Sequence, residues 1–301
     1  MDEVNTVLNK VKGALFGLAI GDALGGTTEF LTKGEIARKY GIVQDIIGGG
    51  CWHLEKGETT DDTAMTLAVA KGILANPEHP VDMIGQEFLN WYASKPKDIG
   101  IIISTVLSTF NGNWFESAKH AHYHMLHEKS AGNGSLMRCL PVALYYQEVK
   151  KVEAVTRSQS NMTHFDELAA EACVIYNRIA FQVLHGKSLK KAIQDEIKGT
   201  IYESSITGAK PDCPPDGFVV NTMKWVLYWL FTSESFSQVV IGAANEGFDT
   251  DTVAAIAGGL AGLSCGYEMI PSKYKDTLLQ KQELAQLAQE LVRQRDCSSA
   301  S

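Results

Sequence analysis

The sequence predicts an all-α fold, and three patterns support this prediction. Apolar residues recur at helical spacing, most plainly near the C-terminus, where Leu284, Leu287 and Leu291 are separated by Gln, Glu and Arg. No segment shows convincing strand alternation, and the most strand-like run, Ile99 to Ile103, is so short and apolar that it is ambiguous. Two further segments are rich in Gly and Ala, a composition that suits helices packed at close range.

The two Gly/Ala segments lie near opposite ends of the chain. Their small residues are Gly13, Ala14, Gly17, Ala19, Gly21 and Ala23, then Ala254, Ala255, Ala257, Gly258, Gly259, Ala261 and Gly262. Gly within a helix costs about 0.5–1 kcal/mol relative to Ala, so its repeated use indicates a close helix–helix contact. Loops are expected at Gly48-Gly49-Gly50, Asn76-Pro77, Lys95–Asp98 and the long segment from Thr200 to Gly217.

Length and composition are those of a folded globular protein. The chain has 301 residues, of which 45% are hydrophobic and 21% are charged. Such a length allows one large domain or two ordinary ones. Because no linker or change of composition divides the chain, we expect one domain over residues 1–296 and a flexible tail over 297–301.

Net charge and cysteine usage indicate which partners and which cellular compartment to expect for this protein. A formal net charge of -8 argues against a nucleic-acid backbone as the main partner, since that binding needs a basic surface. The scattered cysteines form no C-x-x-C pair and indicate reduced thiols in a cytoplasm. The acidic N-terminus lacks the order of a signal peptide, and the stretch from Val253 to Cys265 is too short to span a membrane. We expect a cytoplasmic protein that does not cross a membrane.

Two acidic tracts precede predicted helices. Thr60-Asp61-Asp62-Thr63 comes before the run from Ala64, and Asp249-Thr250-Asp251-Thr252 comes before the helix from Val253. Helix capping explains either tract alone. Each tract nevertheless has two carboxylates where one cap suffices, and Asp249 and Asp251 share a side if the chain there is extended. Tracts that faced each other would offer only oxygen ligands, which Mg²⁺ and Mn²⁺ prefer.

Other polar groups carry weaker signals. Gly132-Asn133-Gly134-Ser135 opens a helical run and could bind phosphate, but it is neither a Walker A loop nor a Rossmann fingerprint. A lone histidine such as His164 is more often a core residue, and Glu29 alone is an ordinary loop acid. The histidines His120, His122, His124 and His127 share a helix face. No acid or cysteine completes a metal site with them, so we expect a solvated face.

Taken in order, these motifs resemble the ADP-ribosylglycohydrolase family. The matching segments are Gly17–Gly25 with Glu29, Thr60–Thr63, Gly132–Arg138, Thr163-His164 and Gly247–Thr252, and Pro96–Gly100 looks like the family's Asp-Ile-Gly segment. The resemblance extends from about Val11 to Pro271. It implies a compact, single-domain orthogonal bundle of helices.

The resemblance also implies roles for particular residues. It implies two divalent cations, Mg²⁺ or Mn²⁺, bound by Thr60, Asp61, Asp62, Asp249, Asp251 and Thr252. It implies catalytic roles for Glu29, Asp61 and Asp98 near the scissile bond, and contacts to ADP-ribose from Gly132, Asn133, Gly134, Ser135 and His164. Thr63 is expected to cap its helix, and Asp22 is expected to be either structural or catalytic.

The activity that the resemblance implies is hydrolysis of the bond between ADP-ribose and a modified protein side chain, with arginine as the preferred leaving group. Its partners would be an ADP-ribosylated protein and a cognate ADP-ribosyltransferase. One alternative is a binding or immunity protein on the same scaffold, which neutralises an ADP-ribosylating toxin by blocking it or by removing its modification. A second is another two-metal hydrolase such as a phosphoesterase, which the lack of histidine near either tract disfavours.

Overall fold

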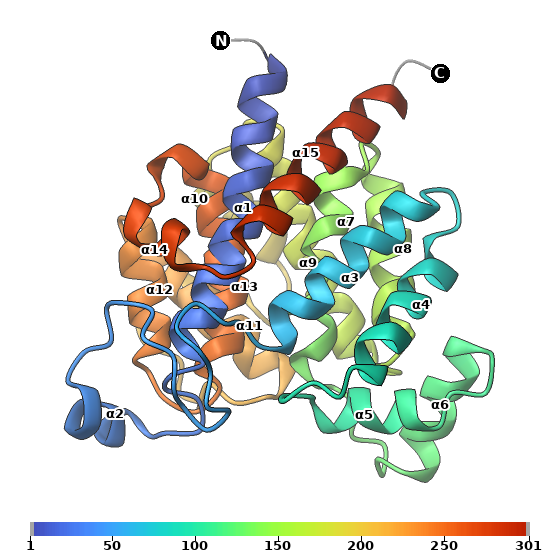
Figure 1. Cartoon of the computed structure of the whole chain (residues 1–301), viewed down its shortest axis with the longest axis horizontal. Coiled ribbons are helices and arrows are strands. Elements are labelled where there is room, and N and C mark those ends of the chain that lie inside the picture. The colour runs from blue at the N-terminus through green and yellow to red at the C-terminus, as the bar shows by residue number, and fades with distance from the viewer. Residues whose placement is uncertain (1–2, 299–301) are drawn as a thin grey trace.

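The computed structural model describes residues 3–298, and helices form its framework (Figure 1). The α-helices are α1 Glu3–Gly25, α2 Lys33–Tyr40, α3 Asp61–Ala75, α4 Pro80–Ala93, α5 Ile101–Ser108, α6 Trp114–His124, α7 Leu140–Tyr145, α8 Val149–Asn161, α9 Glu167–Leu184, α10 Leu189–Ile197, α11 Val219–Thr232, α12 Phe236–Ala244, α13 Thr250–Cys265, α14 Ser272–Thr277 and α15 Lys281–Ser298. Short 3₁₀ helices are η1 Asn133–Ser135, η2 Glu203–Ile206 and η3 Tyr267–Met269. Over these residues the only β pairing is three isolated bridges between loops. The all-α prediction is confirmed.

The two Gly/Ala segments form the central helix pair, α1 and α13. In Figure 1, α1 runs through the middle of the molecule with α13 beside it. A Cβ atom added to Gly17 would overlap the carbonyl oxygen of Gly258, and one added to Gly13 would overlap that of Gly262. Backbone lies against backbone here, so the residues must be small. The predicted close contact is confirmed.

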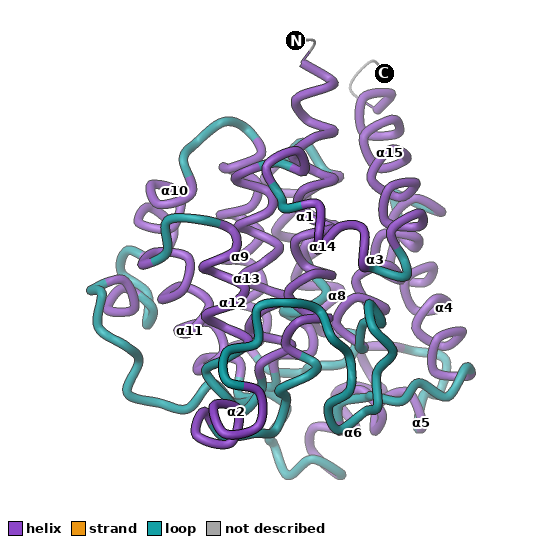
Figure 2. The backbone as a smooth tube through the Cα atoms, turned by 60° about the vertical axis from the view of Figure 1, so that its left-hand side comes forward, coloured by secondary structure: helices purple, strands orange, loops and turns teal. Residues whose placement is uncertain are grey.

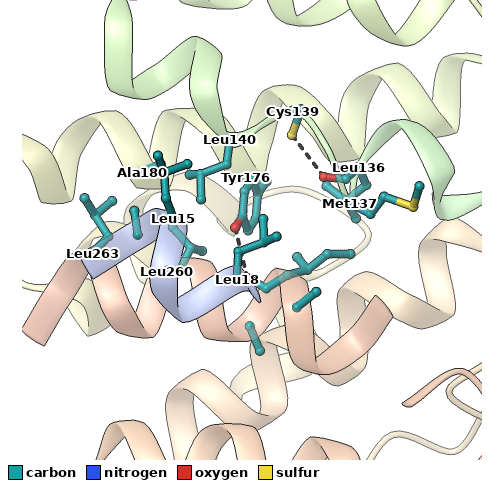
Figure 3. Close-up of a cluster of buried hydrophobic side chains, with 14 of the residues drawn as sticks. Leu15, Leu18, Leu136, Met137, Cys139, Leu140, Tyr176, Ala180, Leu260 and Leu263 are labelled. Carbon is teal, nitrogen blue, oxygen red and sulfur yellow. Dashed lines mark hydrogen bonds between the residues drawn. The ribbon is translucent and has the colours of Figure 1, made fainter. Parts of the chain in front are cut away.

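Around this pair, side chains from α1, α7, α9 and α13 form a continuous apolar core. Figure 3 shows Leu15 and Leu18 of α1 near Tyr176 of α9 and Leu260 of α13. The Tyr176 hydroxyl donates to the carbonyl of Ile256 at 2.9 Å, which satisfies the one polar atom of a buried ring. Burial of each such leucine contributes about 1.5–3 kcal/mol, so this layer holds α1 and α13 in a fixed alignment.

The structure resolves one ambiguity and shifts one boundary. The ambiguous run Ile99–Ile103 is not a strand, because α5 begins at Ile101 with Gly100 as its N-cap. The C-terminal helix α15 continues to Ser298, so Cys297 belongs to a helix rather than to a tail, while residues 299–301 lie outside the described part.

The histidine face of α6 is only partly solvated. His120 and His124 are exposed, and their ring centroids lie 4.7 Å apart. His122 instead turns inward, where its Nδ1 lies 2.6 Å from the hydroxyl of Ser130. His122 therefore does not belong to the solvated face that His120 and His124 form.

The start of α1 and the end of α15 lie at one end of the molecule, and the long connection between α2 and α3 lies at the other (Figures 1 and 2). The C-terminal end of α1 and the N-terminal ends of α3 and α13 also point toward this second end. Within residues 3–298, no helix is both long and apolar enough to span a bilayer.

Candidate active site

The packing of α1 on α13 determines where the second acidic tract lies. A Cβ at Gly25, the last residue of α1, would overlap backbone atoms of Thr250 and Asp251. The end of α1 therefore abuts the start of α13. Asp249 is the N-cap residue and Asp251 already lies in the first turn, so the extended backbone assumed from the sequence is wrong. Both carboxylates nevertheless face one cavity.

The first tract is held at the same place by Asp22 of α1. The Asp22 carboxylate accepts bonds from the backbone N–H of Thr60 at 2.9 Å and of Thr63 at 3.0 Å, and also from the Thr63 hydroxyl. Thr60 is the residue that caps α3, since its hydroxyl accepts from the N–H of Asp62. The expectation that Thr63 caps this helix is therefore wrong, and Asp22 has a structural role in joining α1 to α3.

The two acidic tracts meet. The Thr60 hydroxyl lies 3.5 Å from Oδ2 of Asp251, a residue 191 positions further along the chain. The Thr252 hydroxyl lies 3.3 Å from Oδ2 of Asp62, across a separation of 190 positions. A threonine hydroxyl of each tract thus lies within hydrogen-bonding distance of a carboxylate of the other tract.

Two acids from loops join this cluster. Carboxylate oxygens of Glu29, Asp98 and Asp251 all lie within 4.8 Å of one another, a spacing at which they could share a cation. Glu29 also accepts a bond from the indole N–H of Trp52. Glu29 follows the end of α1 and Asp98 precedes α5, so four separate parts of the chain contribute acids.

The acids open into a cavity of about 760 Å³. Of the predicted site residues, ten line this cavity: Glu29, Asp61, Asp98, Gly132, Asn133, Gly134, His164, Asp249, Asp251 and Thr252. Thr60 and Asp62 do not line the cavity but contact residues that do, Thr60 through Asp251 and Asp62 through Thr252. Ser135 does not reach the cavity, because its hydroxyl is buried and accepts from Ser160 at 2.9 Å.

Burial strongly disfavours the charged forms of these acids. It raises the pKa of Asp98 to about 9 and of Asp61 to about 7, with neighbouring carboxylates adding to both shifts. Burial likewise raises the pKa of Glu29 to about 8, although the Trp52 bond opposes the change. The pKa values of Asp62 and Asp251 lie well above their ordinary value for the same reason.

Two oxygens of the cluster have no partner. Oδ1 of Asp62 and Oδ1 of Asp251 are buried and accept no hydrogen bond. Among the described residues, no Lys or Arg forms an ion pair with any of the cluster acids. Buried carboxylates are normally paired or bound to metal. The donor set therefore fits divalent cations.

Comparison with known proteins identifies the family. The model of the ADP-ribosylglycohydrolase family matches residues 3–300. The chain belongs to the ADP-ribosylglycohydrolase family. It is 36% identical to an ADP-ribosyl-[dinitrogen reductase] glycohydrolase of Rhodospirillum rubrum over 92% of this chain and 93% of that one. It is 28% identical to an ADP-ribosylarginine hydrolase of Serratia proteamaculans (strain 568), over 94% of this chain and 79% of the relative.

A solved structure supports the same assignment. The chain of an ADP-ribosylglycohydrolase-related protein complex superposes with a TM-score of 0.82 and 28% identity, covering 96% of this chain and 99% of that one. As a member of the ADP-ribosylglycohydrolase family, the protein is a hydrolase that acts on ADP-ribosyl groups. The comparisons do not favour a purely binding or immunity role.

In this ADP-ribosylglycohydrolase, the loop Gly132–Ser135, called the glycine loop below, lines the cavity together with His164. A Cβ at Gly132 would lie 3.4 Å from Nε2 of His164, and one at Gly134 would lie 3.3 Å from the same atom. Either would also press on the side chain of Ile102 or Ile103. Both positions therefore need glycine for packing, and their backbone remains open to the cavity.

Sequence reasoning missed the aromatic residues Phe30 and Phe248, and it missed one contact of Asn133. Asn133 was expected only to contact the substrate, but its amide also donates to Oδ2 of Asp249 at 2.7 Å. Phe30 and Phe248 line the cavity beside Glu29 and Asp249, and both have φ near +60°. The N–H of Phe30 donates to the carbonyl of Phe248 at 2.7 Å. The sequence signal for these two residues was that Phe30 directly follows Glu29 and Phe248 directly precedes Asp249.

Proposed function

We propose that the protein removes ADP-ribose from modified protein side chains with the help of two divalent cations, Mg²⁺ or Mn²⁺. The observation that carries this proposal is the meeting of the two acidic tracts around unpartnered carboxylate oxygens. The residues that would hold the cations are Thr60, Asp61, Asp62, Asp249, Asp251 and Thr252. Their oxygen-only donors suit hard cations.

Bound there, the cations would neutralise the carboxylates, hold the ribose hydroxyls and activate a water molecule. The protein's own acids have complementary tasks. Glu29 and Asp98 stabilise the positive charge that develops on the ribose ring as the bond from C1 to the leaving nitrogen breaks. One of these carboxylates takes a proton from the attacking water, whose oxygen forms the new bond to C1. That carboxyl group passes the proton on to the leaving nitrogen, and free ADP-ribose is released.

The pyrophosphate would lie against the cavity wall that the Gly132–Ser135 loop and His164 form together. Gly132 and Gly134 present bare backbone, and the His164 ring lies directly beside both of them. Ser135, whose hydroxyl is held in the interior, would act only through its backbone. This placement sets the ribose toward the acids and leaves the mouth of the cavity for the modified side chain.

Arginine is the proposed leaving group. Phe30 and Phe248 are 66% and 45% exposed, and both line the cavity next to its acids. A guanidinium group combines a flat face that stacks on aromatic rings with a charge that carboxylates attract. Two relatives at 36% and 28% identity are named for dinitrogen reductase and for ADP-ribosylarginine, which supports the same choice.

The decisive experiment offers arginine-linked and serine-linked ADP-ribosylated proteins to the enzyme, with Mg²⁺, with Mn²⁺ and with EDTA. We expect free ADP-ribose from the arginine-linked protein only when a cation is present. Asp251→Asn should abolish this release. Asp82→Asn is the matched control, because Asp82 also lies in the first turn of a helix but is exposed. Release of AMP or phosphate would instead indicate a phosphoesterase.

A cognate ADP-ribosyltransferase is the remaining proposed partner. If the protein also blocks such an enzyme physically, an Asp61→Asn/Asp251→Asn variant should still retain the transferase in a pull-down while releasing no ADP-ribose. If hydrolysis is the sole activity, this variant should neither bind nor inhibit the transferase.

A further inference from the structure

A chain of three buried polar side chains ends at the cavity. Nη2 of Arg138 donates to the Thr163 hydroxyl at 2.8 Å, and this hydroxyl lies 2.8 Å from Nδ1 of His164. All three residues are at most 1% exposed. The other nitrogen of the imidazole, Nε2, lies beside Gly132 and Gly134, and all three residues line the cavity. The chain therefore links a buried charge to the proposed pyrophosphate position.

The direction of each hydrogen bond follows from what each group can do. A guanidinium has only donors, so Thr163 must accept from Arg138. Nη2 donates its other proton to the carbonyl of Gln159 at 3.0 Å. The proton of the Thr163 hydroxyl then has one available acceptor among its contacts, Nδ1 of His164. If Nδ1 carried a proton instead, that hydroxyl would be a buried donor without a partner, which costs about 1–3 kcal/mol.

We propose that Arg138 and Thr163 act as positioning residues that fix His164 in the tautomer with its proton on Nε2. The ring thereby presents a hydrogen-bond donor to the cavity. Phosphate oxygens only accept, so this tautomer attracts a pyrophosphate, whereas the other would turn a lone pair toward it. The expected gain in substrate binding rests on the proposed function, whereas the assignment of the tautomer does not.

The surroundings keep the ring neutral. Burial, together with the nearby Arg138 charge, holds the pKa of His164 well below its ordinary value. Arg138 stays charged, because burial lowers its pKa only to about 10. The guanidinium is held by Gln159 and by the face of Phe88, whose ring centroid lies 4.4 Å away, so its donor to Thr163 has a fixed direction.

The first test is spectroscopic and uses the wild-type protein. Long-range proton–nitrogen NMR spectra of protein with ¹⁵N-labelled histidine distinguish the two tautomers, and His164→Gln identifies the signals. We expect a protonated Nε2 and a bare Nδ1 between pH 6 and 8, without ligand. A ring protonated on Nδ1, or on both nitrogens, would overturn the proposal.

The second test compares two substitutions by calorimetric titration with ADP-ribose in the presence of Mg²⁺. Thr163→Val keeps the shape but removes the hydroxyl, and should weaken binding roughly tenfold. Thr163→Ser keeps the hydroxyl and should bind within about twofold of wild type. In the His164→Gln background, Thr163→Val should have no further effect. Wild-type affinity of Thr163→Val would rule out a positioning role.

The two tests distinguish a failure of the proposed function from a failure of the tautomer assignment. If the wild-type protein does not bind ADP-ribose, the proposed function fails, while the NMR spectrum still decides the tautomer. Arg138→Met removes the obligatory donor, and its spectrum should show both tautomers. Should that variant not fold, as judged by circular dichroism, the wild-type spectrum and the Thr163 pair still decide the question.

Discussion

The side-chain amide of Asn133 donates to Oδ2 of Asp249 at 2.7 Å, which ties the glycine loop to the second acidic tract. A second bond from the same amide reaches the Thr222 hydroxyl at 3.0 Å, so the orientation of the amide is fixed. Asn133 thus sets the position of a proposed metal ligand and of the loop that faces the substrate at the same time.

Loss of this amide should therefore lower activity. Asn133→Ala is expected to reduce kcat/KM for an arginine-linked substrate roughly tenfold or more, since a hydrogen bond to a charged acceptor contributes about 1.5–3 kcal/mol. Asn90→Ala removes an exposed amide on α4 that bonds to Gln86 and should leave activity unchanged. Equal activities of the two variants in a steady-state assay would show that Asp249 needs no such support.

The contact between α1 and α13 should tolerate no added carbon. Gly17→Ala would drive a Cβ into the carbonyl of Gly258, which is backbone and cannot turn away. We expect urea titrations to show that the free energy of unfolding falls by about 1–3 kcal/mol or more. Gly34→Ala is the matched control, because that helical glycine has open space around its Cβ position. It should be neutral or stabilising by about 0.4–1 kcal/mol.

Stability without metal should fall as the pH rises. The pKa values of about 7 for Asp61, 8 for Glu29 and 9 for Asp98 exceed the value of about 4 expected in the unfolded chain. The folded state then binds more protons than the unfolded state between about pH 4 and pH 9, so the free energy of unfolding decreases across this window.

A bound cation should reverse that trend, because it competes with protons for the same carboxylates. Urea titrations in EDTA and in Mn²⁺ at pH 5, 7 and 9 test this prediction. The stabilisation by Mn²⁺ should grow with pH and should be lost in Asp251→Asn but not in Asp82→Asn. Stability in EDTA that rises from pH 5 to 9 would contradict the assignment of buried, uncompensated acids.

The ring of Phe248 should affect activity, and its backbone should affect stability. Its φ of 62° is one that glycine adopts without strain. Phe248→Gly and Phe248→Ala should lower kcat/KM for the arginine-linked substrate equally, roughly tenfold, because both remove the ring. Phe248→Gly should be more stable than Phe248→Ala by about 1 kcal/mol in thermal denaturation.

Lys95 provides a control for the backbone part of that prediction. It is exposed and has a φ of 57°, but it does not line the cavity. Lys95→Gly should relieve the same strain without any change in activity. If the two Phe248 variants differ in activity, the backbone rather than the ring sets the position of the substrate.

Local patterns along the chain predicted much of this protein. Helical periodicity predicted the all-α fold, the spacing of small residues predicted the contact that α1 and α13 make, and the surplus of acids at two helix starts predicted where to look for a site. These features are readable because a helix repeats over three or four residues, so the partners in each pattern are neighbours in sequence.

Tertiary structure alone decided which remote groups meet. Nothing near Asn133 in the sequence points to Asp249, nothing near Thr63 points to Asp22, and burial turns Ser135 and His122 away from the roles expected of them. These contacts depend on how helices far apart in the chain cross and on the φ angles of the loops between them. Such geometry is set by packing over the whole molecule, which no local spacing encodes.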